Sequence, residues 1–179
     1  GIFLRVGCLC GRHDAQQLRK RHSFSSDEEM LQAGLRLHYL QGMGSARLDS
    51  VQLDRAAGKF HVAGEWIQSF ESEHHLQQYG IGNRSVCWML EGYYSGYASE
   101  FLKEDLVCRE TDCRGKGDSA CRFQLRSAAD WGDVARPIQE ILAININKDL
   151  ITWSEQSGMK LDVKGCLDLM AAAINELST

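Results

Sequence analysis

The spacing of apolar and polar residues predicts a helix over residues 24–42. Ser25 or Ser26 can cap its N-terminus, acidic residues fill its first turn, and Gly42 marks its end. One face of this helix carries Met30, Leu31, Gly34, Leu37 and His38. We therefore expect the His38 side chain to point inward, among apolar neighbours.

Strand periodicity follows this helix. Residues 46–54 and 59–67 alternate apolar and polar side chains on either side of Arg55-Ala56-Ala57-Gly58, a pattern typical of a β-hairpin. Two further short strands are predicted over residues 105–110 and 120–126, and a turn rich in Gly and Asp joins them. The pattern therefore predicts two antiparallel strand pairs.

Two helices are expected between these strand pairs. The first runs over residues 67–79 and is closed by Gly80, and the second runs over residues 86–102. In the second helix, residues that suit a core recur at steps of three and four, namely Cys87, Leu90, Tyr94, Tyr97 and Phe101. This spacing predicts a buried stripe with Cys87 at its start.

The segment after Trp131 has a pattern of its own. It predicts a helix over residues 133–145, a hairpin that turns near residues 156–158, and an apolar-striped helix over residues 163–177. The fold class that we expect is α+β, a single domain of mixed helices and antiparallel hairpins over residues 1–132. Residues 133–179 follow it as a separate segment of helices and a hairpin.

The composition excludes several classes of protein. With 44% apolar residues, 25% charged residues and one proline among 179, the chain has the makeup of a folded domain. No apolar run approaches the ~18 residues of a membrane-spanning helix, and no basic-then-apolar leader is present. The net charge of −4 argues against a broad nucleic-acid-binding face. We expect a cytoplasmic protein.

The seven cysteines are many for this length, and in a reducing compartment they indicate metal ligands or buried small residues. The segment CRETDCRGKGDSACRF brings together Glu110, Cys113 and Cys121, which suit a tetrahedral zinc ion. The fourth ligand is Cys87 or Cys108, the latter ~6.6 Å from Glu110 along a strand. Four protein ligands predict a structural ion, whereas the plainer alternative is a set of buried, inert cysteines.

Several motifs occur along the chain in a fixed order. They are GIFLRVGCLCGRHDA, AGLRLHYLQGMG, GEWIQSFE, GYYSGYASEF and CRETDCRGKGDSACRF, followed by Trp131. Together they resemble the aromatic-effector sensor domain, of the vinyl-4-reductase type, of XylR/DmpR-like transcription activators. These activators respond to phenols, toluene or xylenes and work with sigma-54 RNA polymerase. The resemblance covers residues 1–132 and implies a ligand-binding sensor rather than an enzyme.

The resemblance also implies roles for particular residues. The family's zinc ligands fall on Cys87, Glu110, Cys113 and Cys121, which selects Cys87 over Cys108. In phenol-responsive members a histidine and a tryptophan hold the ligand hydroxyl, and these roles fall on His38 and Trp66. The pocket walls fall on Leu31, Gly64, Tyr97 and Cys108. Three of these, all but Tyr97, replace bulky aromatic walls, so we expect an effector larger than phenol, such as a hydroxybiphenyl or an alkylphenol.

A full-length activator of this kind is expected to be a homodimer with an ATPase module and a DNA-binding module. The chain has no G-x4-G-K-[ST] sequence and no room for either module, and its start at Gly1 suggests a fragment or a processed chain. Residues 133–179 resemble the hairpin and helix that normally precede the first motif. They are a permuted equivalent of that segment, part of a tandem sensor, or a fortuitous match. Cys8, Cys10 and Cys166 are expected to be buried small residues.

Two other functions compete with the sensor. A zinc-dependent enzyme could use Glu110 and the histidines, but a closed set of four ligands argues against catalytic zinc. A lipid-binding or partner-binding scaffold is the other alternative, because the same domain type resembles vesicle-tethering subunits and pigment-biosynthesis accessory proteins. The polar pair of His38 and Trp66 argues against it, since an acyl-chain tunnel needs no two convergent hydroxyl partners.

Overall fold

The computed structural model describes residues 1–143, which form a four-stranded antiparallel sheet and six α-helices and so confirm the α+β class. The helices are α1 (Ile2–Arg21), α2 (Asp27–Leu40), α3 (Phe70–Tyr79), α4 (Trp88–Leu102), α5 (Ala128–Trp131) and α6 (Arg136–Ala143). The strands are β1 (Ser45–Asp54), β2 (Lys59–Ile67), β3 (Leu106–Asp112) and β4 (Cys121–Ser127). Short 3-10 turns occur at η1 (Arg114–Lys116) and η2 (Gly132–Val134). The hairpin and helix predicted after residue 145 lie outside the described residues.

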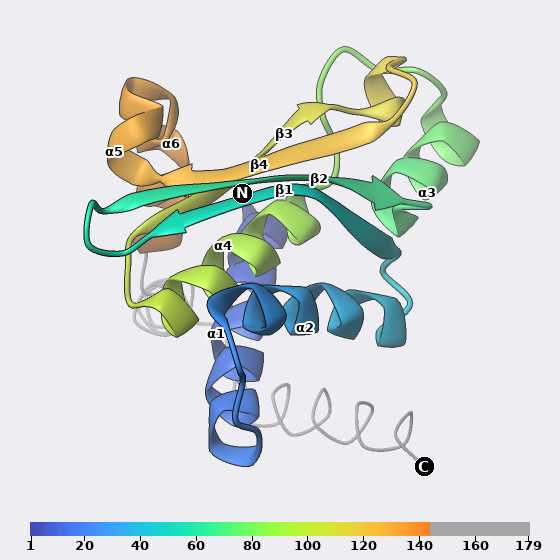
Figure 1. The fold of residues 1–179 in the computed structure, drawn as a ribbon. Helices are drawn as coiled ribbons and strands as arrows, with labels where there is room; N and C mark the ends of the chain where they lie inside the picture. Colours follow the sequence, from blue (N-terminus) through green and yellow to red (C-terminus); the bar gives the residue numbers. More distant parts are fainter. Residues whose placement is uncertain (144–179) are drawn as a thin grey trace, which may run out of the picture. The chain divides into compact units, whose positions relative to one another are not determined.

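The sheet has the strand order β1-β2-β4-β3, and α2 and α4 lie on the same side of it (Figure 1). Side chains alternate along β2, so that Phe60, Val62, Gly64 and Trp66 are buried while their neighbours are more exposed. The inward residues of β2 and β4 form the main hydrophobic core with residues of α2 and α4. This core therefore lies between the sheet and these two helices.

Most of the predicted elements are confirmed, with small shifts at their ends. Helix α2 begins after Ser26, whose hydroxyl accepts a hydrogen bond from the backbone N–H of Glu29 at 3.1 Å. The β1–β2 hairpin turns where expected. Helix α3 begins later than predicted, at Phe70, because Ser69 caps it by accepting a hydrogen bond from the Ser72 N–H at 3.3 Å. It ends before Gly80 as expected.

Helix α1, of 20 residues, is the element that the hydrophobic pattern does not predict. Its buried positions are mostly small residues, namely Leu4, Gly7, Cys8, Gly11 and Ala15. Glycine contributes nothing to an apolar periodicity and disfavours isolated helices, so the usual signal is weak here. Cys8 is buried as expected, but the prediction for Cys10 is wrong, because that residue lies on the exposed face of α1. Cys166 lies outside the part of the chain that is described.

Glycines let α1 and α4 approach each other until their backbones touch. A Cβ atom at Gly7 or Gly11 would lie 2.2 Å from the Met89 carbonyl oxygen or 2.1 Å from that of Tyr93. The contact is reciprocal, because Gly92 and Gly96 of α4 meet the backbone of α1 in the same way. No side chain larger than a hydrogen fits between the two helices at these positions.

Residues 1–142 form one compact unit, and residues 143–179 form the second. In the first unit, Ala135 and Ile138 pack in a small apolar cluster with Leu4, Val107 and Ala128. The predicted boundary after residue 132 stays a prediction. Among the described helices, none has the length and apolar character needed to cross a membrane.

Candidate metal centre and effector pocket

Three cysteines and one glutamate converge at the end of the sheet where α4 begins. Cys87 immediately precedes α4, Glu110 lies in β3, Cys113 precedes η1, and Cys121 begins β4. One donor atom from each residue lies within 4.8 Å of the others, and all four residues are buried. The structure thus brings together the four residues predicted as metal ligands, and Cys108 is outside this group.

Backbone and hydroxyl groups surround the four side chains. The Cys87 N–H donates a hydrogen bond to Glu110 Oε2 at 3.2 Å, and the Ser69 hydroxyl lies 3.1 Å from Cys87 Sγ. The Arg114 N–H approaches Cys121 Sγ at 3.4 Å. The other carboxylate oxygen, Glu110 Oε1, is buried and has no hydrogen-bond partner among residues 1–143. That orphaned acceptor fits a site that holds a cation.

The electrostatics of the cluster also favour a cation. Burial raises the pKa of the Glu110 carboxyl to about 8. A hydrogen bond from Cys121 lowers the pKa of the Cys113 thiol, while the same contact raises that of Cys121 to about 12. Four acidic groups this close cannot all ionise alone, because each charge opposes the next. A bound divalent cation removes this conflict and releases the protons. The donor set of three sulfurs and one oxygen suits a soft metal ion.

Two buried glutamates that the sequence analysis missed support the cluster from behind. Cys87 makes no capping hydrogen bond to α4, and Glu71 of α3 replaces it by accepting from the N–H groups of Met89 (2.9 and 3.0 Å) and Leu90 (3.1 Å). Glu91 accepts a hydrogen bond from the Glu110 N–H at 2.5 Å. Burial raises the pKa of both carboxyls to about 7. Their position next to Cys87 and Glu110 shows only in the fold.

His38 and Trp66, the residues predicted to hold an effector hydroxyl, are both in the main core. His38 is 1% exposed, and neither ring nitrogen has a hydrogen-bond partner within the described chain. Burial lowers the pKa of His38 to about 3, so its imidazole is neutral. Trp66 is 3% exposed, and its indole N–H is likewise unpaired among these residues. Unpaired buried polar atoms are costly unless a ligand or water satisfies them.

The predicted pocket walls share this core. Leu31, Tyr97 and Cys108 are completely buried in the same hydrophobic cluster, and the Tyr97 hydroxyl donates to the Met30 carbonyl oxygen at 2.9 Å. At Gly64, a Cβ atom would lie 2.8 Å from Phe123 Cζ. Phe123 therefore occupies the space next to Gly64, and this position supplies no extra room.

The two sites are neighbours in the sheet. Trp66 of β2 is the cross-strand partner of Cys121 of β4, and Gly64 is the partner of Phe123. The Trp66 and Phe123 rings stack with their centroids 4.6 Å apart. Cross-strand partners point to the same face of a sheet, so the metal cluster and the indole lie side by side.

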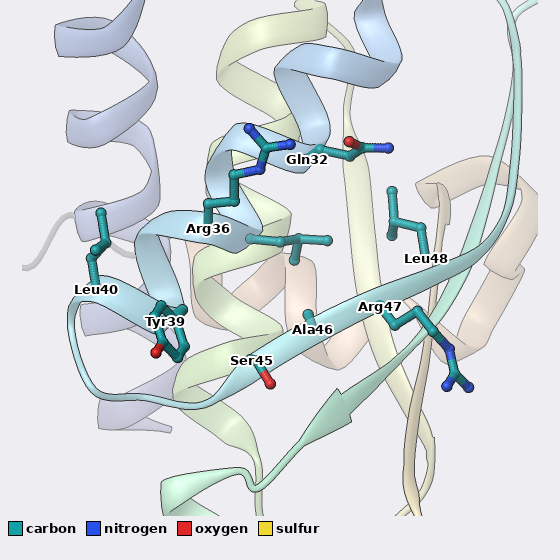
Figure 2. A pocket seen from close by; sticks show the side chains of 9 residues that line it. Gln32, Arg36, Tyr39, Leu40, Ser45, Ala46, Arg47 and Leu48 are labelled. Carbon is teal, nitrogen blue, oxygen red and sulfur yellow. The ribbon is translucent and has the colours of Figure 1, made fainter.

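A surface groove between α2 and β1 is a different feature (Figure 2). It is lined by Gln32, Leu35, Arg36, Tyr39, Leu40, Ser45, Ala46, Arg47 and Leu48. None of the residues predicted to bind the effector lines it. The predicted effector contacts instead belong to the core beneath the sheet.

Comparisons with known proteins agree with these features. Residues 66–127 match the vinyl-4-reductase domain family, and residues 1–54 match the family described as activator of aromatic catabolism. The chain is 40% identical to the transcriptional regulatory protein XylR of Pseudomonas putida over 135 residues, which are 75% of this chain and 24% of XylR. It is 31% identical to the phenol regulator MopR of Acinetobacter guillouiae over 130 residues, 73% of this chain and 23% of MopR. The chain therefore spans about a quarter of the length of these curated relatives.

A solved structure gives the same result for the fold. The crystal structure of the phenol-responsive sensory domain of the transcription activator PoxR with phenol matches with a TM-score of 0.75 and 32% identity. The match covers 81% of this chain and 72% of that one. These matches are to regulatory sensor domains and not to enzymes. The chain belongs to the family of aromatic-effector sensor domains of XylR/DmpR-like transcription activators.

Proposed function

We propose that this domain binds a phenolic effector between His38 and Trp66 and acts as the sensor of a transcription activator of aromatic catabolism. The observation that carries the proposal is the pair of buried side chains without polar partners in the described chain. A pocket that binds a hydroxyl group needs such atoms. The relatives named for aromatic or phenol regulation, and the PoxR domain with phenol, support the same effector class.

The two side chains have complementary chemistry toward a phenol. The Trp66 indole N–H can only donate, so it donates to the phenolic oxygen. His38, kept neutral by burial, has one ring nitrogen free to accept the phenolic proton. A hydrocarbon of the same shape leaves both groups unpaired. A phenol is therefore favoured over its deoxygenated analogue by about 1–3 kcal/mol for each buried group.

The metal that we propose for Cys87, Glu110, Cys113 and Cys121 is a structural zinc ion. Three sulfurs and one carboxylate oxygen complete a tetrahedral shell, so zinc would act as a cross-link rather than as a Lewis acid. The four residues come from three parts of the chain, namely the start of α4, strand β3 with the following turn, and the start of β4. Zinc would thus hold the start of α4 to the β3–β4 pair.

The effector that we propose is larger than phenol, such as a hydroxybiphenyl or an alkylphenol. Leu31 and Cys108 stand where phenol sensors are expected to have bulky aromatic walls. Because Phe123 occupies the space next to Gly64, the additional room has to come from these two positions. The full-length protein is proposed to be a cytoplasmic homodimer with ATPase and DNA-binding modules that works with sigma-54 RNA polymerase.

Calorimetric titration of the zinc-loaded protein with phenol, 2-hydroxybiphenyl and biphenyl tests the effector proposal. Both phenols should bind, 2-hydroxybiphenyl more tightly, and biphenyl should bind at least tenfold more weakly than 2-hydroxybiphenyl. Trp66→Phe, which keeps a ring and removes the N–H, should weaken the binding of phenols by about tenfold or more.

Trp131→Phe is the matched control for this titration. The Trp131 indole N–H donates to the Val107 carbonyl oxygen at 2.8 Å, outside the predicted pocket. This variant should lose an indole hydrogen bond and keep its affinity for phenols. Equal binding of biphenyl and 2-hydroxybiphenyl, or unchanged affinity in Trp66→Phe, would refute the role of the polar pair.

A further inference from the structure

Tyr94, in the middle of α4, has a buried hydroxyl group with no hydrogen-bond partner in the described chain. The two neighbouring tyrosines of this helix differ from it. Tyr93 donates to Asp14 Oδ2 at 2.8 Å, and Tyr97 donates to the Met30 carbonyl oxygen at 2.9 Å. Burying a hydroxyl without a partner costs free energy that phenylalanine would not. The unpaired oxygen therefore needs an explanation.

The surroundings of Tyr94 place it at the predicted effector site. Its ring meets Phe123 edge to face with centroids 5.5 Å apart, and Phe123 in turn stacks on Trp66. Its nearest ionisable neighbours are Cys108 and Tyr97, both expected pocket walls. Tyr94, Trp66, Tyr97 and Cys108 all belong to one buried cluster. The orphaned hydroxyl is thus among the residues that we expect to contact an effector.

The protonation state of Tyr94 defines what the hydroxyl can bind. Burial raises its pKa well above the usual value, so the group stays neutral. A neutral phenol side chain can donate one hydrogen bond and also accept one. Its natural partner is an oxygen substituent such as a hydroxyl group.

We propose that the Tyr94 hydroxyl is a second polar contact in the effector pocket, in addition to His38 and Trp66, and that it selects aromatic effectors with two oxygen substituents. This inference rests on the proposed function. One hydroxyl of the effector pairs with His38 and Trp66, and the second pairs with Tyr94. The predicted class is therefore dihydroxylated aromatics, including biphenyldiols.

The test compares aromatics that differ by one hydroxyl group. Phenol is compared with the three benzenediols, and 2-hydroxybiphenyl is compared with 2,2′-biphenyldiol, by calorimetric titration of the zinc-loaded protein. At least one diol should bind tenfold or more tightly than its monohydroxy partner. Tyr94→Phe should abolish that preference and leave the affinity for the monohydroxy compounds unchanged or higher.

Tyr93→Phe is the matched control, because it removes a hydroxyl that is already paired with Asp14. This variant should keep the preference for the diol. In the absence of effector, Tyr94→Phe should raise the melting temperature by a few degrees, whereas Tyr93→Phe should lower it.

Two results would overturn the inference. One is a wild-type protein that binds phenols but prefers no diol, and the other is a diol preference that survives in Tyr94→Phe. Both leave the proposed phenol sensor intact. If no phenol binds at all, the proposed function fails together with the inference.

Discussion

The two ends of the site differ in how their polar groups are satisfied. At the start of α4, the cluster of Cys87, Glu110, Cys113 and Cys121 has too many acidic groups in contact with one another. Around the middle of α4, His38, Trp66 and Tyr94 have no polar partners in the described chain. Excess charge requires an ion that stays bound, whereas missing partners suit a molecule that binds and leaves. The comparison separates a structural region from a sensing region on one helix.

Loss of a metal ligand should produce the largest effect. Cys113→Ser removes a thiolate from the cluster, and the remaining groups cannot hold zinc in a closed tetrahedral shell. We expect loss of the metal and of several kcal/mol in the free energy of unfolding, with an upper limit of about 10 kcal/mol. Native mass spectrometry and chemical denaturation measure both quantities.

The exposed Cys10 provides the control for this variant. Cys10→Ser should keep both the metal and the stability, because its side chain is outside the cluster. If Cys113→Ser still retains one zinc per chain and unfolds at the wild-type midpoint, the structural role of the cluster is wrong. The difference between the two regions would then disappear.

Acid should affect the sensing region through His38. The folded-state pKa of about 3 lies below the ordinary value of 6.5, so the unfolded chain binds the proton more readily. Stability from this residue is complete above pH 6.5 and is lost as the pH falls from 6.5 toward 3. The loss approaches 1.4 kcal/mol per pH unit and amounts to about 2 kcal/mol at pH 5.

Denaturation with urea between pH 7 and pH 5 measures this effect. His38→Gln cannot take up a proton in this range, so its stability should decline by about 2 kcal/mol less than that of the wild type. Parallel declines for the two proteins would show that His38 is not buried in its neutral form. That result would also remove the proposed acceptor of the phenolic proton.

The smallest effect is expected at Glu71, which connects α3 to the structural region. Glu71→Ala removes the acceptor for the N–H groups of Met89 and Leu90 and should cost about 1 kcal/mol. Glu71→Gln keeps one acceptor oxygen and should cost less. Metal affinity should fall about tenfold in Glu71→Ala, which a competition titration with a chelator measures.

Glu28 is an exposed glutamate in the first turn of α2 and serves as the control for Glu71. Glu28→Ala should leave metal affinity unchanged. Equal metal affinity in Glu71→Ala and the wild type would mean that the start of α4 holds Cys87 without help from α3.

Local patterns predict much of this fold and of the metal site. Ser26, the hairpin at Gly58 and the spacing of Glu110, Cys113 and Cys121 are properties of short segments, and the sequence is enough to find them. The choice of Cys87 over Cys108 needed the family resemblance, because a strand and a helix lie between the alternatives.

Tertiary packing decides the features that sequence analysis missed. Tyr94 and Tyr97 are equal members of one predicted stripe, and only the fold shows that one hydroxyl is paired and the other is not. Glu71 caps a helix that is not its own, which no local motif encodes. Helix α1 escapes detection because small residues form its inward face.

The glycine contact between α1 and α4 limits how this domain can be changed. In a saturation library selected for response to new aromatics, Gly7, Gly11, Gly92 and Gly96 should accept no other residue, because even a methyl group meets backbone there. Leu31 and Cys108 touch side chains instead, so variants at these positions can be absorbed by repacking. Redesign of the specificity therefore has to work through side chains around α4, because the helix itself is held in place.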